Sequence, residues 1–523
     1  MKIMALKAIL ACLTPVFLLA QQETEIYLVD VLAPEMRTTQ RTPLEVFKSL
    51  KEPQSLGKPL NISNNEGYDN QPSFLDEDHI LFSSTRNGQT DIAVYSISKD
   101  TTTWISNTPN GSEYSPIKIP GKESVSAIRL DVNELQRLYQ YDLRTGVSKE
   151  LLPDLKVGYH VWYNDHIVVC SVLIENRMDL VVANLKEGTN HTVQKNVGRS
   201  LHKIPNSELV SYISKAGKPF EIKSLNPSSN TTRTLNFIWN GREDITWLSE
   251  NTILATTEKA IVQVPTDTTG IWPVFHQFRP RKLYNMSRMA VSPDGKKIAI
   301  VAEPSPDKIV QKQVESFNAR DLDAFANCYT NNVLVTNYPS DTITVGRQQM
   351  KAGYKSFYEK TPNVEVKVSN RITIGATVID HEVVTIDGRQ NLQVAIYEVD
   401  GLIKSMRFIQ DKKVDIDPEI IVQKQLDAYN NRDIDGFLAT YTKDVALYNF
   451  PNMLRTNGLE AMRKGYGNYF TSTPDLHADI KNRIVIGNMV IDEEEVTANG
   501  IKSSAVALYE VENGKISKVT FVR

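Results

Sequence analysis

Cysteine, long apolar runs and an excess of charge of either sign are all scarce in this chain of 523 residues. It has three cysteines, 59 basic and 62 acidic residues, and a formal net charge of −3. Such a balance argues against nucleic acid as a main partner, because phosphate binding needs clustered lysine and arginine. So few cysteines exclude a small disulfide-stabilised scaffold. We therefore expect a multidomain globular protein, since the length exceeds that of one hydrophobic core.

Common catalytic and metal-binding motifs are also missing. The sequence has no His-Glu-x-x-His and no Gly-x-Ser-x-Gly, and no two histidines are three or four residues apart. Structural zinc sites and zinc hydrolases depend on such spacings. We therefore predict no metal site and no cofactor.

The first residues, MKIMALKAILACLTPVFLLAQQ, combine early lysines with a short apolar stretch. This pattern predicts a signal peptide over residues 1–20, with cleavage after Ala20 and a secreted or periplasmic location. A lipoprotein site at Cys12 is the less favoured alternative. No later segment has 18 uncharged apolar residues, so we expect no membrane span. The remaining Cys170 and Cys328 fall in different predicted domains, which argues against a disulfide.

Short strands separated by turns dominate residues 21–304, and they recur about every 40 residues. A Ser-Pro-Asp-Gly turn occupies residues 292–295, and residues 86–92 read R-N-G-Q-T-D-I. Both phrases resemble the TolB-type β-propeller repeat. The resemblance implies six blades, with residues 25–31 and 59–63 completing the blade that begins at Met289. It also implies that the channel mouth recognises a polypeptide or a glycan.

The last two-fifths of the chain is a tandem duplication. Residues 309–324 read IVQKQVESFNARDLDA and residues 421–436 read IVQKQLDAYNNRDIDG, with nine of sixteen positions identical. The offset of 112 residues then holds without a gap to Glu398 and Glu510. We predict two domains of the same fold, at 307–411 and 417–523.

Each copy reads as helices followed by strands, which indicates an α+β fold. The first helix carries an apolar face from Ile309, and Asp321 is placed to cap a second helix that bears Phe325 and Tyr329. A third helix is expected after Gly346. The expected strands of copy 1 are 333–338, 364–374, 377–386, 391–399 and 403–409, with partners in copy 2.

These repeats resemble the SnoaL-like, nuclear transport factor 2-like family. The matching phrases are Asn-x-Arg-Asp-[LI]-Asp-[AG]-Phe at 318–325 and 430–437, and Ala-x-Tyr-Glu-Val at 395 and 507. The resemblance implies a curved sheet wrapped on helices to form a cone with an apolar pocket. It is specific for the fold and not for an activity, because the family holds enzymes, scaffolds and binders.

The resemblance also identifies three positions used by steroid isomerases of this superfamily: a tyrosine, a carboxylate base and a proton-donating acid. All three chemical groups are replaced in both copies. The residues found there are Gln313, Tyr338 and Ala395 in copy 1, and Gln425, Phe450 and Ala507 in copy 2. Isomerase activity by that mechanism is therefore not expected.

A different polar set remains on the strands. Asp380 and Glu382 are two residues apart and share one face of a strand, as Asp492 and Glu494 do in copy 2. Two interpretations fit this pattern: acid–base residues in a pocket, or the solvent-exposed face of an antiparallel sheet, which we favour. His381 lies on the opposite face, and any role for it would belong to copy 1 alone.

Aromatic and basic residues of each copy are candidates for a ligand pocket. The aromatic residues could equally form core, and the two arginines could bind an acidic ligand or pair with Asp380 and Asp492. The candidates are Tyr338, Tyr354, Arg371 and Tyr397 in copy 1, and Phe450, Tyr466, Arg483 and Tyr509 in copy 2.

Together these patterns favour a binding or interaction protein. Its propeller would recognise a polypeptide or glycan, and its cones would hold a small apolar ligand or pair with each other within the chain. The alternative is an isomerase, cyclase or hydrolase that uses a pocket carboxylate. A purely structural role is the third interpretation.

Overall fold

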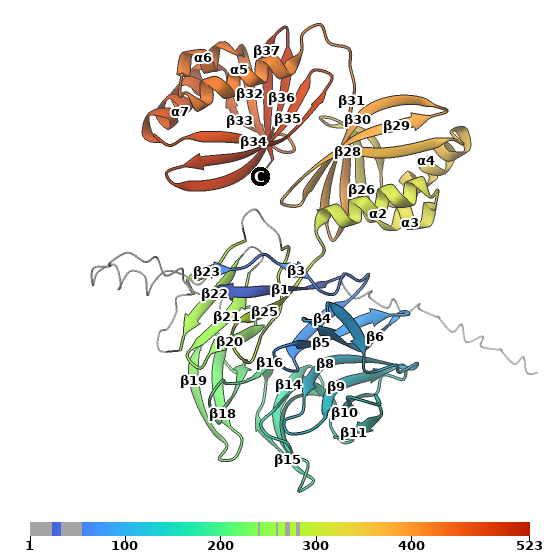
Figure 1. The fold of residues 1–523 in the computed structure, drawn as a ribbon, viewed down its shortest axis with the longest axis vertical. Coiled ribbons are helices and arrows are strands. Elements are labelled where there is room, and N and C mark those ends of the chain that lie inside the picture. The colour runs from blue at the N-terminus through green and yellow to red at the C-terminus, as the bar shows by residue number, and fades with distance from the viewer. Residues whose placement is uncertain are drawn as a thin grey trace, which may run out of the picture.

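The computed structural model describes residues 23–32, 55–238, 241–257, 260–266, 272–278 and 283–522. The expected signal peptide lies outside this part of the chain. A propeller-like region built of small sheets carries two α+β units, which lie side by side above it in Figure 1.

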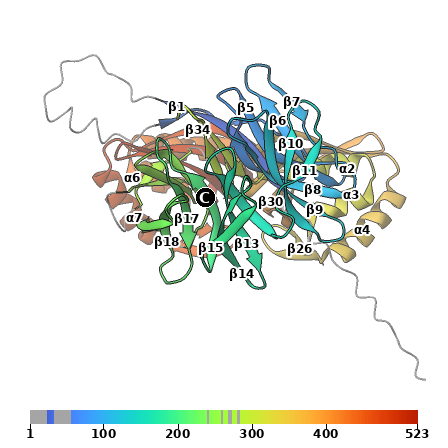
Figure 2. The ribbon, with the colours of Figure 1, turned by 90° about the horizontal axis from the view of Figure 1, so that it is seen from below.

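Six antiparallel sheets are arranged as a ring in the described N-terminal region, which Figure 2 shows from below. Their strand segments match the predicted 40-residue spacing, so the expected propeller of six blades is confirmed. The first sheet contains β1 (Glu25–Leu32), β2 (Ser55–Leu56), β3 (Leu60–Asn61), β24 (Met289–Val291) and β25 (Lys297–Ala302). The second and third contain β4 (Asp69–Phe74), β5 (His79–Arg86), β6 (Gln89–Ser96), β7 (Thr101–Trp104), β8 (Gly111–Lys118), β9 (Ser124–Asp131), β10 (Gln136–Asp142) and β11 (Ser148–Glu150). The fourth and fifth contain β12 (Val157–Trp162), β13 (Ile167–Ile174), β14 (Arg177–Asn184), β15 (Thr189–Gln194), β16 (Val197–Lys203), β17 (Val210–Ser214), β18 (Glu221–Asn226) and β19 (Thr231–Phe237). The sixth contains β20 (Ile245–Ser249), β21 (Thr252–Thr256), β22 (Ile261–Pro265) and β23 (Val274–His276).

The two ends of the ring are joined in one sheet. Strand β1 pairs with β25 in antiparallel register, with Tyr27 opposite Ile300, and β3 pairs with β1. The chain closes the ring in this way because an unpaired edge strand leaves backbone N–H and C=O groups without partners. The predicted closure is confirmed.

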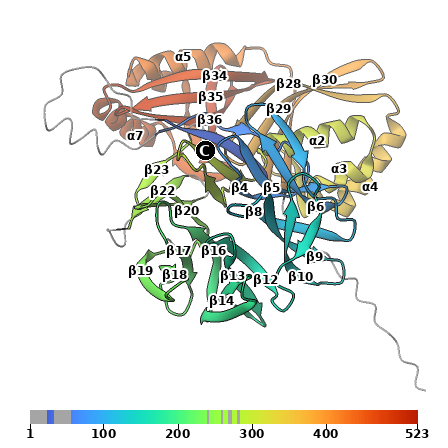
Figure 3. The same ribbon diagram turned by 60° about the horizontal axis from the view of Figure 1, so that its bottom comes forward.

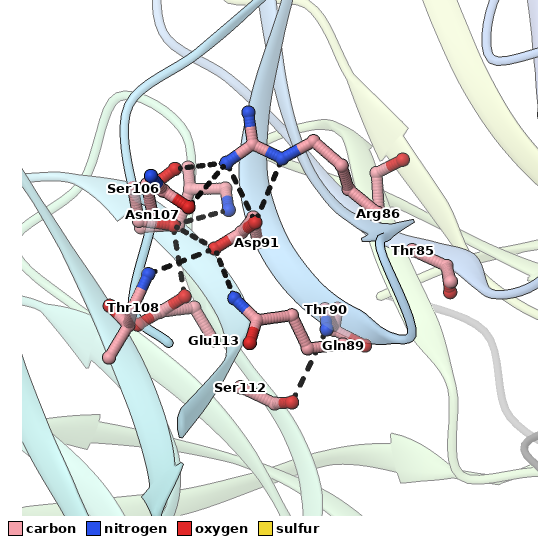
Figure 4. Close-up of polar contacts among 12 residues, drawn as sticks. Thr85, Arg86, Gln89, Thr90, Asp91, Ser106, Asn107, Thr108, Ser112 and Glu113 are labelled. Carbon is pink, nitrogen blue, oxygen red and sulfur yellow. Dashed lines mark hydrogen bonds and ion pairs between the residues drawn. The ribbon is translucent and has the colours of Figure 1, made fainter. Parts of the chain in front are cut away.

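The R-N-G-Q-T-D-I motif holds neighbouring blades together. Arg86 donates through Nε and Nη2 to Oδ2 of Asp91, at 3.0 and 2.8 Å. Ser106 donates to Asp91 at 3.3 Å and is placed 2.9 Å from an oxygen of Glu113, in the next blade. Figure 4 shows this network, in which each carboxylate is buried and hydrogen-bonded. The contacts of Asp91 are therefore structural, since they join a strand of one blade to the segment that leads into the next.

Each C-terminal copy is a curved six-stranded sheet with three helices on its concave face (Figure 3). Copy 1 contains α2 (Pro306–Asn318), α3 (Leu322–Asn327), β26 (Tyr329–Asn337), β27 (Asp341–Val345), α4 (Arg347–Lys360), β28 (Val364–Ile374), β29 (Thr377–Ile386), β30 (Arg389–Asp400) and β31 (Leu402–Gln410). Copy 2 contains α5 (Pro418–Asn430), α6 (Ile434–Ala439), β32 (Tyr441–Asn449), β33 (Met453–Asn457), α7 (Leu459–Ser472), β34 (His477–Ile486), β35 (Met489–Ala498), β36 (Ile501–Glu512) and β37 (Lys515–Val522).

Local chemistry sets the helix boundaries. Proline occupies the first turn of α2 and of α5, where its missing N–H has no intrahelical partner to lose. The Asp321 side chain accepts a hydrogen bond from the Ala324 N–H at 2.9 Å and caps α3, and Asp433 caps α6 in the same way. These caps agree with the sequence prediction.

In each copy the end of the second helix was predicted wrongly and one strand was missed. Helix α3 ends at Asn327, so Tyr329 begins a strand instead of continuing the helix, because it pairs with Ile403 in the sheet. Strand β27 was not predicted. It is a short edge strand with mostly exposed residues, which gives no alternating apolar pattern.

The convex faces of the two sheets meet, and the helices of both copies lie on the outside of the pair (Figure 1). Asn370 and Asn482 exchange side-chain hydrogen bonds across the contact at 2.8 and 2.9 Å. A shared apolar cluster surrounds them. It contains Ile372, Ile379, Val394, Ile396 and Ile409 from copy 1, and Ile484, Ile486, Met489, Ile491, Val506, Leu508 and Val522 from copy 2.

Candidate functional site

The concave side of copy 1 has an open cavity of about 800 Å³ between the sheet and helices α2 and α4. Its walls are mainly apolar and aromatic. The lining includes Phe317, Tyr354, Phe357, Tyr397, Met406 and Phe408. Small-molecule sites in proteins have this size and this type of wall, with a few polar groups that orient the ligand.

The acidic group in this wall is Glu382, on β29. Its side chain is 2% exposed. Tyr397 donates its hydroxyl hydrogen to Oε1 of Glu382 at 2.9 Å, and Nε2 of Gln393, directly opposite on β30, donates to Oε2 at 2.7 Å. Burial is the main cause that raises the pKa of Glu382 to about 7, and the Gln393 hydrogen bond opposes it. At neutral pH the carboxyl group is therefore present in both protonation states.

Copy 2 repeats this arrangement in a smaller cavity of about 500 Å³. Tyr509 donates to Glu494 at 2.9 Å, and burial raises the pKa of Glu494 to about 7. Ala505 lies opposite Glu494 on β36, where copy 1 has Gln393. Glu494 therefore has one hydrogen-bond donor fewer than its counterpart.

The favoured interpretation of the paired carboxylates was wrong. Asp380 and Glu382 do not face solvent, since they are 0% and 2% exposed, and Asp492 and Glu494 are 1% and 8% exposed. Their face of the strand is covered by the helices of the same copy. A strand with one polar face has the same alternating pattern whether that face meets water or a lined cavity.

The two carboxylates of each pair have different partners. Arg371 forms two hydrogen bonds to Asp380, at 2.6 and 2.7 Å, and Arg483 forms the same two to Asp492. Such bidentate pairs hold both charges in a fixed geometry. Neither arginine lines a cone cavity, so Glu382 and Glu494 are the carboxyl groups positioned to meet a ligand there.

The structure brings together some of the other candidates and separates the rest. Tyr354 and Tyr397 line the cavity of copy 1, and Tyr466 and Tyr509 line that of copy 2. In contrast, Tyr338 and Phe450 pack at the contact between the copies. His381 lies on the opposite face of β29 from Glu382 and lines neither cavity.

The positions aligned with the isomerase groups also lie in different parts of each copy. Gln313 and Gln425 line the two cavities, and Ala395 and Ala507 are buried in the cores beneath them. Tyr338 and Phe450 are outside both cavities, as above. The loss of the isomerase groups therefore does not leave the cones without a carboxyl group, because Glu382 and Glu494 supply one from another strand.

The Glu–Tyr pairs were not predicted from the sequence as units. A signal was available: both pairs are separated by 15 residues, and both lie in strands that the duplication aligns. Gln393 and Arg455 were not predicted either. Gln393 lies opposite Glu382 on the neighbouring strand, and Arg455 lies on β33, a strand that was not predicted.

A third cavity of about 730 Å³ lies in the propeller. Asp244 in its wall accepts a hydrogen bond from Nε of Arg199 at 2.9 Å and from Nε of Arg288 at 3.2 Å. Two arginines share one carboxylate there. Tyr159 and Trp247 add aromatic surface to the same wall.

The described residues lack two further kinds of feature. They contain no group of three or more His, Cys, Asp or Glu residues placed to hold a metal ion. No helix among them has the length and apolar character needed to cross a bilayer.

Comparisons with known proteins identify the C-terminal fold. The SnoaL-like domain model matches residues 310–406 and 422–519. A cystatin-fold protein of uncharacterised function from Novosphingobium aromaticivorans is 28% identical, with a TM-score of 0.20, over 21% of this chain and 99% of that one. No curated protein has a significant match.

Two solved structures are similar to the N-terminal region. TolB from Acinetobacter baumannii is 11% identical with a TM-score of 0.35, over 53% of this chain and 64% of that one. An oligogalacturonate lyase in complex with manganese is 12% identical with a TM-score of 0.36, over 47% and 79%. Neither similarity assigns an activity to this chain. In its described residues the chain contains a propeller-like region of one five-stranded and five four-stranded sheets, followed by two SnoaL-like domains.

Proposed function

We propose that each SnoaL-like domain binds a small, mainly apolar molecule in its cone and contacts it through Glu382 or Glu494. The observation that carries this proposal is a buried carboxyl group in the wall of an apolar cavity, repeated in both copies. A buried polar group is expensive unless it has a partner, and each carboxyl group has hydrogen-bonding capacity left for a ligand. The ligand therefore carries a carbonyl or hydroxyl group on an apolar body.

Matched glycines allow this proposal to be tested. Gly353 and Gly465 line the two cavities at equivalent helix positions, and a Cβ atom at either would meet nothing within 4 Å. Phenylalanine at these positions is expected to fill the cavity while the helix is retained. The probe is Prodan, a neutral naphthalene ketone whose fluorescence reports an apolar site.

The expected result is saturable Prodan binding to the full chain, reduced in G353F and in G465F and reduced in the double variant to whatever binds outside the cones. Glu382→Gln, which keeps a neutral hydrogen-bonding side chain at every pH, should remove the dependence of binding in copy 1 on pH near 7. Binding to the double variant that equals binding to the wild type would reject the proposal.

Acid–base catalysis in the same cones is the second candidate. It is supported by the pKa of about 7 of both glutamates, because a general acid or base works best when its pKa is near the operating pH. Saturable turnover of an enone, lactone or epoxide, abolished in Glu382→Gln or Glu494→Gln with Prodan binding intact, would support this function. A panel without any turnover would count against it.

For the propeller, the proposal is recognition of a polypeptide or glycan at the channel that holds Asp244. Arginine and aromatic side chains supply hydrogen bonds and flat apolar surface to such ligands. Binding of the full chain to peptide and oligosaccharide arrays, and its loss in Arg288→Ala, tests this. The secreted or periplasmic location stays a prediction.

A further inference from the structure

The two cones differ in charge at one equivalent position. Ile343 on β27 lines the cavity of copy 1, and Arg455 on β33, 112 residues later, lines the cavity of copy 2. Among the described residues, Arg455 is the one cationic side chain in the wall of the second cavity, and the first has none. The same fold therefore presents two electrostatically different cavities.

Arg455 is placed to receive a ligand, because its charge is not used inside the protein. No ion pair is found for it within the described part of the chain, whereas Arg463 pairs with Asp435 and Arg483 pairs with Asp492 and Glu419. Its guanidinium lies 5.6 Å from the centre of the Phe521 ring, in the same cavity wall. Stacking on a ring orients a guanidinium and leaves its N–H groups available for a bidentate contact with an anion.

Other substitutions between the copies also add hydrogen-bonding groups to the second cavity. Tyr429 and Tyr469 stand where copy 1 has Phe317 and Phe357, and all four line their cavities. Ser504, in the wall of the second cavity, stands at the position of Leu392. Hydroxyl groups complement the oxygens of an anionic head group, which apolar side chains cannot do.

We propose that copy 2 selects a small amphipathic anion, with Arg455 as the residue that determines this specificity, and that copy 1 selects a neutral apolar molecule. The proposal rests on the binding function proposed above and names its ligand classes. A carboxylate or sulfonate of the ligand contacts Arg455, and its apolar body extends among Tyr466, Tyr469 and Phe521. In copy 1, an anion would meet Glu382 without any cation in the wall, which makes its desolvation unfavourable.

The test uses two naphthalene probes with different charges on the full chain: Prodan, which is neutral, and 1-anilinonaphthalene-8-sulfonate (ANS), which is an anion. G353F leaves the cavity of copy 2 open, and G465F leaves that of copy 1 open. Fluorescence titrations in these two backgrounds assign binding to a copy. The double variant measures binding elsewhere on the protein, which is subtracted.

In the G353F background, Arg455→Ile is expected to weaken ANS binding by about tenfold or more, because a charge-assisted hydrogen bond to an anion is lost. Prodan binding should change by less than about threefold, since it carries no anionic group to contact Arg455. In the G465F background, Ile343→Arg should strengthen ANS binding by about tenfold. Added salt should weaken ANS binding to the arginine forms and not to the isoleucine forms.

Two outcomes would overturn the inference and are distinguishable. If both probes bind in the open cones and neither exchange at 343 and 455 changes ANS affinity, the selectivity is wrong while the binding function stands. If neither probe binds to G353F or G465F more than it binds to the double variant, both the proposed binding function and this inference are wrong.

Discussion

The two C-terminal copies retain the same buried polar contacts but differ in the walls of their cavities. Both have an arginine–aspartate pair with distances of 2.6 and 2.7 Å and a tyrosine–glutamate bond of 2.9 Å. The residues around those contacts differ: Gln393 is replaced by Ala505, and Ile343 by Arg455. The comparison separates the buried contacts that both copies keep from the cavity-wall residues in which they differ.

This separation has a physical basis. A buried charge pair is strongly coupled to the fold, because removal of one partner leaves the other charge without compensation. A side chain in a cavity wall has free space on one side, so its replacement costs little packing. Duplicated domains can therefore diverge in their cavities while their ion pairs stay fixed.

The largest expected effect is the loss of a buried ion pair. Arg371→Ala leaves Asp380, which is 0% exposed, without its cation, and should lower the free energy of unfolding by about 3–5 kcal/mol. Arg483→Ala should have a similar effect in copy 2. Urea denaturation of the full chain, followed by a probe of the C-terminal domains, measures both.

Arg463→Ala is the matched control for this experiment. Its pair with Asp435 is exposed, with side chains 55% and 80% accessible, so its loss should cost less than about 1 kcal/mol. A loss for Arg371→Ala no larger than that for Arg463→Ala would show that the buried pair is not required by the fold.

The second prediction concerns pH. Between an ordinary pKa of 4.5 and its folded pKa of about 7, Glu382 is ionised in the unfolded chain but still protonated in the folded protein. The unfolded state is therefore favoured as pH rises, by up to about 3 kcal/mol, and the effect is complete above pH 7. Glu494 should contribute equally.

Glu382→Gln removes a titrating group without removing its hydrogen-bonding capacity. The melting temperature of this variant minus that of the wild type should increase as the pH rises from 5 to 8. Glu494→Gln should show the same trend. The wild type contains other buried acids, such as Asp69, so only the difference between variant and wild type is informative. If the melting temperatures of variant and wild type change with pH in parallel across this range, the raised pKa is contradicted.

A smaller effect is expected from the residue opposite each glutamate. The Gln393 side chain donates 2.7 Å from Oε2 of Glu382 and favours its ionised form. Gln393→Ala should therefore raise the pKa of Glu382 by up to about one unit, and Ala505→Gln should lower that of Glu494. Carbon-13 NMR of labelled glutamate carboxyl groups measures both. If the pKa of Glu382 in Gln393→Ala and the pKa of Glu494 in Ala505→Gln shift in the same direction, the role given to the opposite residue is wrong.

Much of the fold of the two C-terminal copies could be predicted from the sequence, because the duplication aligns their elements. Strands 364–374 and 377–386 were predicted at their observed bounds. The burial of Asp380 and Glu382 was not predicted, because period-2 alternation places both on one face of the strand but does not show what covers that face. The covering helices are a tertiary feature.

Side-chain direction limited the prediction of the site in a second way. Tyr354 and Tyr338 were grouped as pocket aromatics, yet one lines the cavity and the other packs between the copies. Both faces of a cone's sheet carry aromatic and aliphatic residues, one face toward its own helices and the other toward the second copy. Apolar character alone could not distinguish them.

The smallest predicted effect tests that distinction directly. Tyr338 lies 3.1 Å from Thr520 and accepts a hydrogen bond from Lys518 at 3.2 Å, whereas its counterpart Phe450 has the Arg407 guanidinium 5.0 Å from its ring. Tyr338→Phe should lower the unfolding free energy by about 1 kcal/mol or less, since Lys518 keeps its ion pair with Glu510. Prodan affinity should not change, because Tyr338 is outside both cavities. A change in affinity without a change in stability would place this residue in the ligand site and not between the copies.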